Sequence, residues 1–220
     1  MWMLLPTALA SGFGRQEETL QSTRYARVDG EGPAFGRWRN RRGAFEASHF
    51  ADGQIEHVDT YDGTDLKETR LYAADGQLRA VVDWADAKVT LSLAPAVVVP
   101  IGAWSEVAIA DLVFRAPPLV ASETGWTGEH LAIAVQASAD PFSSDFSTAL
   151  RAGCGCEVES EQTVWVAGRA GAHYRLQRPT ATADVVAIAV PDGLLVLTAA
   201  GPDLTALVSL RAMLATGRAP

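Results

Sequence analysis

The chain has 220 residues, of which 48% are hydrophobic and 20% are charged, a composition typical of one large or two small globular domains. Its 18 basic and 26 acidic side chains give a net charge of −8, and neither half of the chain is basic, so binding to nucleic acid is disfavoured. No apolar run approaches the roughly 18 residues that a transmembrane helix needs, so we expect membrane contact to be at most peripheral.

Residues 1–11 form an apolar N-terminal segment. Ala8-Leu9-Ala10 has the small-x-small form that signal peptidase cleaves, although no basic residue precedes it. The segment is either the end of a longer, truncated signal peptide or an ordinary apolar terminus that packs on the core. We expect export to the periplasm or the extracellular envelope, with a cytoplasmic location as the alternative.

Residues 12–102 are expected to form an antiparallel meander. Residues 12–24 are polar and fit a short helix, after which short alternating runs are separated by Asp-Gly pairs. Asp-Gly favours hairpins because both central positions of a type I′ turn need positive φ. The pairs are Asp29-Gly30, Asp52-Gly53, Asp62-Gly63 and Asp75-Gly76, and the strands are predicted at 35–40, 44–50, 55–61, 66–72 and 78–84.

A short internal repeat supports this meander. The segment that begins Ala51-Asp52-Gly53-Gln54 recurs as Ala74-Asp75-Gly76-Gln77, at an offset of 23 residues. The repeat predicts that the same turn chemistry starts two strands of one sheet.

Residues 103–220 are expected to form the second unit, a sheet with a C-terminal helix. The helix is predicted between an N-cap at Asp203 and a stop at Gly217, with a leucine stripe facing the sheet. The whole pattern predicts an α+β fold of two consecutive antiparallel β-sheet units, each backed by helix. Further strands are predicted at 96–99, 106–114, 131–136, 156–167, 172–177, 184–190 and 194–198, and a short helix at 145–151.

One basic cluster is a candidate ligand-binding site. Four guanidinium groups and an indole fit anionic lipid headgroups or a carboxylate-rich partner. The alternative is a solvated strand and turn in which the arginine stems cover the indole. The cluster consists of Arg37, Trp38, Arg39, Arg41 and Arg42.

Cys154 and Cys156 form the only cysteine motif in the chain. A C-x-C pair can bind a soft metal or cycle as a dithiol, but a four-ligand zinc site needs two further ligands. The four histidines, at 49, 57, 130 and 173, are scattered singly and offer no partner at motif spacing. We therefore expect a structural role, as a local disulfide or as two thiols, and neither a metal nor a cofactor.

The carboxylates do not form a catalytic motif. Asp59, Asp62 and Asp65 surround Gly63, but their spacing differs from that of a calcium loop and favours turn residues. Glu157 and Glu159 alternate on one predicted strand with nothing to isolate them from water. Because no nucleophile or metalloprotease motif is present either, we expect that the protein is not an enzyme.

Two segments resemble known families. Residues 36–72 resemble the half-barrel proteins of the lipoprotein-carrier family, through a W-x-R strand, a D-G hairpin and a Y-D-G turn. Residues 163–179 and 190–214 are similar to the C-terminal module fused to such carriers and to the PsbP-like fold. The matching residues of the first segment are Trp38, Arg39, Phe45, Glu46, Asp52, Gly53, Tyr61, Asp62 and Gly63.

The resemblance implies a half-barrel-like unit followed by a PsbP-like unit. A half-barrel offers an apolar concave face that shields acyl chains, with about 0.8 kcal/mol gained per buried methylene. The implied function is an exported, non-enzymatic binding protein of the cell envelope for a lipid, a lipoprotein or another hydrophobic ligand. The alternative is an envelope interaction or sensor module that binds no small ligand.

The alternation of the strand at 172–177 predicts the surroundings of three residues. Tyr174 is expected to be buried beneath the C-terminal helix, on the side opposite Arg175. Arg175 is therefore expected to be exposed, and Arg169 to be a turn residue with no part in catalysis.

Overall fold

The computed structural model describes residues 13–18, 22–27, 35–39, 44–51, 54–123, 125–136, 140–178, 181–191, 193–201 and 205–218. The chain divides into two compact units, Met1–Lys88 and Val89–Pro220. The expected boundary lay further along the chain, near residue 102. Residues 1–11, with the signal-like segment, lie outside the described residues.

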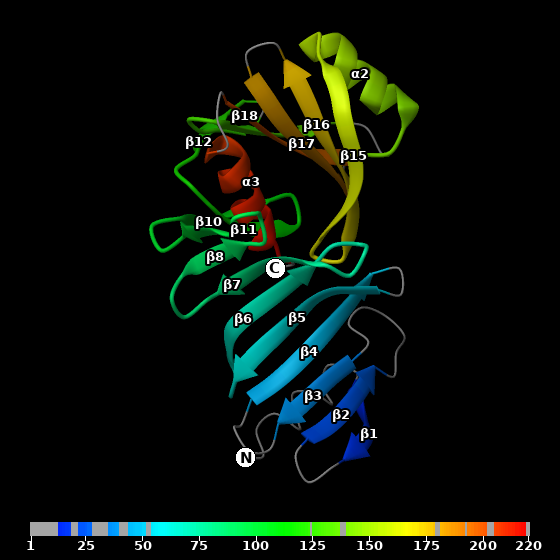
Figure 1. Ribbon diagram of the computed structural model, residues 1–220, viewed down its shortest axis with the longest axis vertical. Coiled ribbons are helices and arrows are strands. Elements are labelled where there is room, and N and C mark those ends of the chain that lie inside the picture. The colour runs from blue at the N-terminus through cyan, green and yellow to red at the C-terminus, as the bar shows by residue number, and fades with distance from the viewer. Residues whose placement is uncertain are drawn as a thin grey trace. The chain divides into compact units, whose positions relative to one another are not determined.

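The first unit is an antiparallel meander in which each strand pairs with the next along the chain (Figure 1). The alternation of apolar and polar residues produces this pattern, since successive side chains of a strand point to opposite faces. The strands are β1 (Phe13–Glu18), β2 (Ser22–Arg27), β3 (Phe35–Arg39), β4 (Ala44–Ala51), β5 (Gln54–Asp62), β6 (Asp65–Tyr72) and β7 (Leu78–Asp83).

The meander predicted from the sequence is confirmed. The two strands that start at the repeat copies, β5 and β7, belong to one sheet, because both pair with β6. The short helix expected within residues 12–24 is wrong, because β1 and β2 occupy this stretch and pair with each other. No helix is found among the described residues of the first unit, so the helix expected to back it is not seen there.

The second unit contains eleven strands and two helices within the described residues. Ser143 caps the first helix by accepting a hydrogen bond from the backbone N–H of Phe146, and Gly155 ends it with a φ of +57°. The elements are β8 (Lys88–Leu91, whose first residue ends the first unit), β9 (Val97–Pro100), β10 (Ser105–Ile109), β11 (Leu112–Ala116), β12 (Val120–Ser122), β13 (Gly125–Thr127), β14 (Leu131–Gln136), α2 (Ser144–Cys154), β15 (Glu157–Val166), β16 (Arg169–Arg178), β17 (Ala181–Val190), β18 (Gly193–Gly201) and α3 (Thr205–Ala215).

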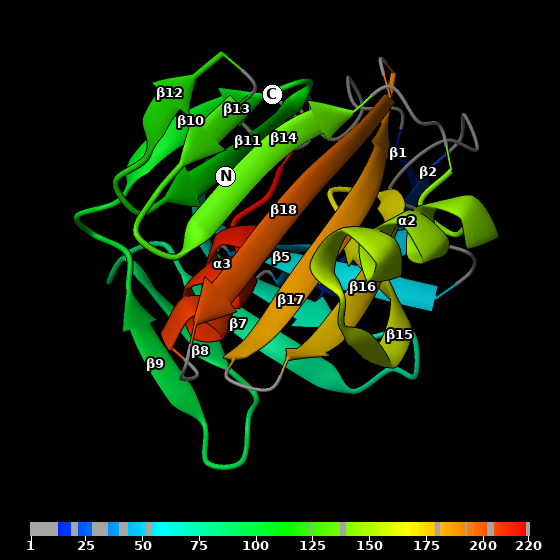
Figure 2. The same cartoon turned by 90° about the horizontal axis from the view of Figure 1, so that it is seen from above.

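Seven strands of the second unit form one antiparallel sheet in the order β12-β13-β14-β18-β17-β16-β15. Figure 2 shows α2 and α3 on opposite faces of this sheet. β17 lies inside the sheet, between β18 and β16, and is an almost continuous apolar run, because both of its faces are covered. Ile188 of β17 packs in the core cluster under α3, whereas Val185 packs in the cluster with Phe146 of α2.

The sequence missed a turn inside the strand expected at 106–114. Ala110, with a φ of +54°, and Asp111 separate β10 from β11, and the two strands pair as a hairpin. The short strands β8, β12 and β13 were also not predicted. The three sheets are open within the described residues, and none of the described helices is long and apolar enough to span a membrane.

Tyr174 is fully buried, as predicted, but on the other face of the sheet. Its ring lies 5.8 Å from that of Phe146 on α2, so the expectation that it packs beneath α3 is wrong. Arg175 is half-buried, and its Nε lies 3.2 Å from Oδ1 of the buried Asp184, so the expectation of an exposed Arg175 is also wrong. The alternation along β16 was predicted correctly, but the face that carries Tyr174 packs against α2 and not α3, and Arg175 on the opposite face is not freely exposed.

Candidate functional site

Two histidines and an aspartate meet on one face of the first unit. His49 on β4 lies directly opposite His57 on β5, and their rings stack with centroids 3.9 Å apart. Asp59 follows His57 by two residues along β5, so its side chain points to the same face. One potential ligand atom from each residue lies within 4.8 Å of the others.

The carboxylate of Asp59 is held by a chain of hydrogen bonds. Thr69, its cross-strand partner on β6, donates its hydroxyl hydrogen to Oδ1 over 2.6 Å. Trp84 in turn donates its indole N–H to the Thr69 hydroxyl oxygen over 2.9 Å. The Tyr61 hydroxyl lies 3.5 Å from Oδ2. Since Asp59 is buried, these contacts orient Oδ2 toward the two imidazoles.

Both imidazoles place Nε2 close to the carboxylate of Asp59. Nε2 of His49 lies 3.3 Å from Oδ2, and Nε2 of His57 lies 3.7 Å from the same oxygen. On its other side, Nδ1 of His57 lies 3.5 Å from Oε2 of the buried Glu56. A carboxylate beside Nδ1 favours the tautomer that carries its hydrogen there, which leaves the Nε2 lone pair free.

Nε2 of His49 is a buried atom that forms no hydrogen bond with any described residue. Its distance of 3.3 Å from Asp59 brings it close to an acceptor, but outside hydrogen-bonding geometry. A buried polar atom without a partner is costly, and such atoms are common where an ion or a water belongs.

The charges of the cluster suit a cation. Burial raises the pKa of Asp59, but the contacts with His49 and His57 and the hydrogen bond from Thr69 outweigh burial and lower the pKa below 3.8. Burial and the nearby Asp59 raise the pKa of the Tyr61 hydroxyl to about 12. At neutral pH an ionised carboxylate and a protonated phenol therefore lie beside the two histidines.

The ligand types, two imidazoles and a carboxylate, suit a transition-metal ion such as zinc better than a hard cation such as calcium. Zinc binds imidazole nitrogen and carboxylate oxygen at about 2.0–2.1 Å, and a tetrahedron with these bonds places its ligand atoms about 3.3 Å apart. The measured nitrogen–oxygen distances of 3.3 and 3.7 Å are close to that edge. The two rings are stacked and 15° from parallel, so their Nε2 lone pairs run side by side, and ligation of one ion would require the rings to turn toward each other.

The basic cluster predicted from the sequence is only partly described. Arg37, Trp38 and Arg39 lie on β3, where the structure defines the backbone pairing with β2 and β4. Arg41 and Arg42 lie outside the described residues, so binding of an anionic ligand by this cluster stays a prediction.

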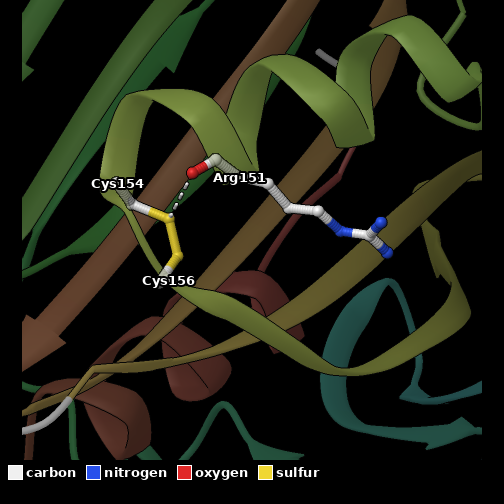
Figure 3. The surroundings of a disulfide bond; sticks show 3 residues. All are labelled: Arg151, Cys154 and Cys156. Atoms are coloured by element: carbon white, nitrogen blue, oxygen red, sulfur yellow. Dashed lines mark hydrogen bonds between the residues drawn. A yellow bond between two sulfur atoms is a disulfide. The ribbon is translucent and has the colours of Figure 1, made fainter.

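Cys154 and Cys156 form a disulfide (Figure 3). This is one of the two structural states that the sequence left open. Bonded to each other, the two sulfurs are not available as thiolate ligands for a metal. Sγ of Cys154 lies 3.8 Å from the carbonyl oxygen of Arg151, at the end of α2.

Of the three aspartates around Gly63, only Asp59 belongs to the cluster. Asp62 and Asp65 are exposed where β5 turns into β6, and Asp65 contacts Lys67, as expected for turn residues. The turn itself has a positive φ at Gly63. Asp59 is instead buried between the histidines and Thr69, which the sequence did not predict.

Arg169 differs from its expected role as a turn residue. The positive φ values lie at Ala167 and Gly168, and Arg169 begins β16. Its guanidinium group pairs with Asp111 and donates to the carbonyl oxygen of Ala189 over 3.3 Å. It therefore ties the start of β16 to the β10–β11 turn.

The cluster was not predicted from the sequence, because the four histidines are scattered singly along the chain. Counting back from a two-residue turn at Asp52-Gly53 would place His49 opposite Glu56. A β-bulge between His49 and Phe50 shifts the register by one residue and places His49 opposite His57. The nearest signal in the sequence is that each strand of the predicted hairpin carries a histidine close to the turn.

Comparison with known proteins identifies no family. No family model and no curated protein matches the chain. One partly similar solved structure is a mutant of S. aureus TarM in complex with Fondaparinux, alpha-GlcNAc-glycerol and UDP, with 12% identity and a TM-score of 0.30 over 41% of this chain. Another structure of TarM has 11% identity and a TM-score of 0.27 over 53% of this chain. In both cases the match covers 20% of the TarM chain.

These comparisons correct one prediction. Both structures are of a glycosyltransferase, which is an enzyme, and the expectation that the chain is not an enzyme is not retained. Likeness at these TM-scores transfers neither a fold nor an activity to this chain.

Proposed function

We propose that the first unit binds a divalent transition-metal ion, with zinc as the best fit, through Nε2 of His49, Nε2 of His57 and Oδ2 of Asp59. The observation that carries the proposal is that these three atoms lie close together. One of them, Nε2 of His49, is buried and forms no hydrogen bond with a described residue. Two imidazoles and a carboxylate are ligands that zinc commonly takes.

The residues around the three ligands support this assignment. Glu56 beside His57, and Thr69 with Trp84 behind Asp59, are the kind of outer contacts that hold metal ligands in place. Without an ion, a cluster of this kind would be expected to satisfy its own polar atoms. Nε2 of His49, which lies 3.3 Å from Asp59 but outside hydrogen-bonding geometry, would gain a partner in a bound cation.

Three protein ligands leave one position of a tetrahedral ion open. Sites of this type hold a water molecule or a small ligand in the fourth position, whereas structural zinc sites take four protein ligands. We therefore expect the ion to keep an exchangeable water. A zinc-bound water is more acidic than bulk water and can act as a nucleophile, which would make the site suited to hydrolytic chemistry.

The test is a titration of metal-free, full-length protein with Zn²⁺ by isothermal titration calorimetry. We expect one ion per chain, and a loss of affinity of at least about tenfold in His49→Ala, His57→Ala and Asp59→Asn. Asp59→Asn is the most informative variant, because an amide oxygen can still accept from Thr69 but is a weaker ligand. Co²⁺ should give the intense visible absorption of a tetrahedral site.

His130→Ala is the matched control. His130 is a half-exposed histidine beside Glu129, and its removal should leave the affinity unchanged. Circular dichroism of each variant separates loss of metal from loss of the fold. Unchanged zinc affinity in folded His57→Ala, or equal losses in His57→Ala and His130→Ala, would refute the proposal.

The functions expected from the resemblance stay predictions. Binding of a lipid, a lipoprotein or another hydrophobic ligand, the role as an envelope sensor and the export of the protein rest on the sequence patterns given above. A displacement assay with a fluorescent fatty acid tests the first of these.

A further inference from the structure

The Cys154–Cys156 disulfide closes a ring over a single intervening residue. It joins the last residue of α2 to the residue before β15, with the two Cα atoms 5.2 Å apart. A disulfide stabilises a protein mainly by restricting its unfolded chain, and the effect grows with the length of the closed loop. A loop this short contributes least, so the fold gains little from the bond.

The chain around the disulfide is held in place by other interactions. Gly155 adopts a φ of +57° and donates its N–H to the carbonyl oxygen of Arg151 over 3.0 Å, which completes the helix cap. α2 is anchored on the sheet by Phe146, which is buried and contacts Tyr174. The cap and the anchor do not depend on the sulfur–sulfur bond, so they are expected to persist when it is broken.

Cys154 and Cys156 are each partly exposed to solvent. Cys154 and Cys156 are half-buried, at the margin of the core cluster around Tyr174. A solvent thiol can therefore approach the bond without unfolding of the sheet, which a fully buried structural disulfide would not allow.

We propose that Cys154 and Cys156 form a reversible dithiol–disulfide couple that exchanges with a thiol of the glutathione class. A glutathione thiolate attacks Sγ of Cys154, the bond to Cys156 breaks, and Cys156 leaves as a thiolate. A second glutathione thiolate then attacks the glutathione sulfur of the mixed disulfide and releases Cys154. The two protein thiolates take up the protons of the two glutathiones. Overall, the protein disulfide is reduced to two thiols while two glutathiones are oxidised to one glutathione disulfide.

The geometry assigns different roles to the two sulfurs. A thiolate on Cys154 would lie beside the carbonyl oxygen of Arg151, at the negative end of α2. The Arg151 guanidinium group points away from both sulfurs and does not compensate this charge (Figure 3). Cys156 lies outside the helix, so it is the better leaving group during reduction, and in the reverse direction its thiolate attacks Sγ of Cys154 in the mixed disulfide.

The experiment equilibrates the full-length protein with glutathione and glutathione disulfide at a series of ratios. Alkylation followed by mass spectrometry gives the reduced fraction, and circular dichroism reports the fold. We expect full, reversible passage between the two states across millimolar glutathione mixtures, with an unchanged spectrum. A bond that stays oxidised in excess glutathione, or a fold that is lost on reduction, overturns the proposal.

Single variants test the roles of the sulfurs. With Cys156 as the only thiol, in Cys154→Ser, reaction with glutathione disulfide should be at least about threefold faster than with Cys154 as the only thiol, in Cys156→Ser. Equal rates, or a faster Cys154, overturn the assignment of Cys156 as the sulfur that more readily forms a thiolate. The metal site plays no part in this experiment, so its failure leaves the proposed function untouched.

Discussion

A buried carboxylate in the second unit offers the sharpest test of the electrostatics. Asp184 on β17 has no exposed surface, and three cationic or potentially cationic groups lie 3.2 Å from its oxygens. They are Nε2 of His173 and Nε of Arg175 on β16, and Nη2 of Arg211 on α3. Asp184→Asn keeps the shape of the side chain and removes its charge, leaving these groups without their common partner.

The expected magnitude follows from the pKa of Asp184. Burial raises the pKa, but the hydrogen bonds and charges of His173, Arg175 and Arg211 outweigh burial and lower it from 3.8 to about 2. A difference of one unit corresponds to about 1.4 kcal/mol, so the ionised carboxylate stabilises the fold by about 2 kcal/mol relative to a neutral group. We expect Asp184→Asn to lower the free energy of unfolding by about this amount at pH 7.

The pH dependence distinguishes this charge effect from a packing effect. Because the pKa is lower in the folded protein, the stabilisation is fully present above about pH 4 to 5 and is lost as the pH falls toward about 2. In urea denaturation followed by circular dichroism, the difference between native protein and Asp184→Asn should shrink over that range. Asp65→Asn, at an exposed pair with Lys67, should change stability by less than about 0.5 kcal/mol. A difference that stays constant between pH 5 and pH 2 would refute the reasoning.

Three further predictions address the cores and the metal site. Tyr174→Phe should lower the free energy of unfolding, measured by urea denaturation, by about 1–2 kcal/mol, because the buried carbonyl oxygen of Pro141 loses the hydroxyl that donates to it over 2.7 Å. An unchanged free energy of unfolding would contradict this. Gly171→Ala should lower the free energy of unfolding by at least about 2 kcal/mol, since a Cβ at residue 171 would lie 2.6 Å from the backbone oxygen of Ala187. An unchanged free energy of unfolding would show that β16 and β17 can move apart without cost. Zinc affinity measured by calorimetry should fall at least about tenfold between pH 7 and pH 5, because metal-binding imidazoles must be neutral, and a flat profile would exclude histidine ligands.

Local patterns in the sequence were sufficient for most of the strands. The runs between the Asp-Gly pairs, the strand at 131–136 and the C-terminal helix all appear close to their predicted bounds. Alternation also predicted that Tyr174 is buried. These features depend on neighbouring residues alone, and the pattern of side chains along one strand or helix is enough to specify them.

The tertiary structure decided what packs against each face. Alternation divides a strand into two faces, but it does not say which helix covers which. Both faces of the sheet carry apolar side chains, so the sequence offered no way to choose between α2 and α3 for Tyr174. The partners of Asp184 come from β16 and α3, and Arg211 meets Asp184 only when α3 has docked.

For the candidate metal site, the sequence supplies the ligand residues, and the tertiary structure brings them close together. His57 and Asp59 share a face because they are two residues apart on one strand. His49 joins them only through the bulge beside Phe50, and Thr69 reaches Asp59 only through the pairing of β5 with β6. A shift of one residue moves every side chain of a strand to the opposite face, and no local pattern in this chain predicts that shift.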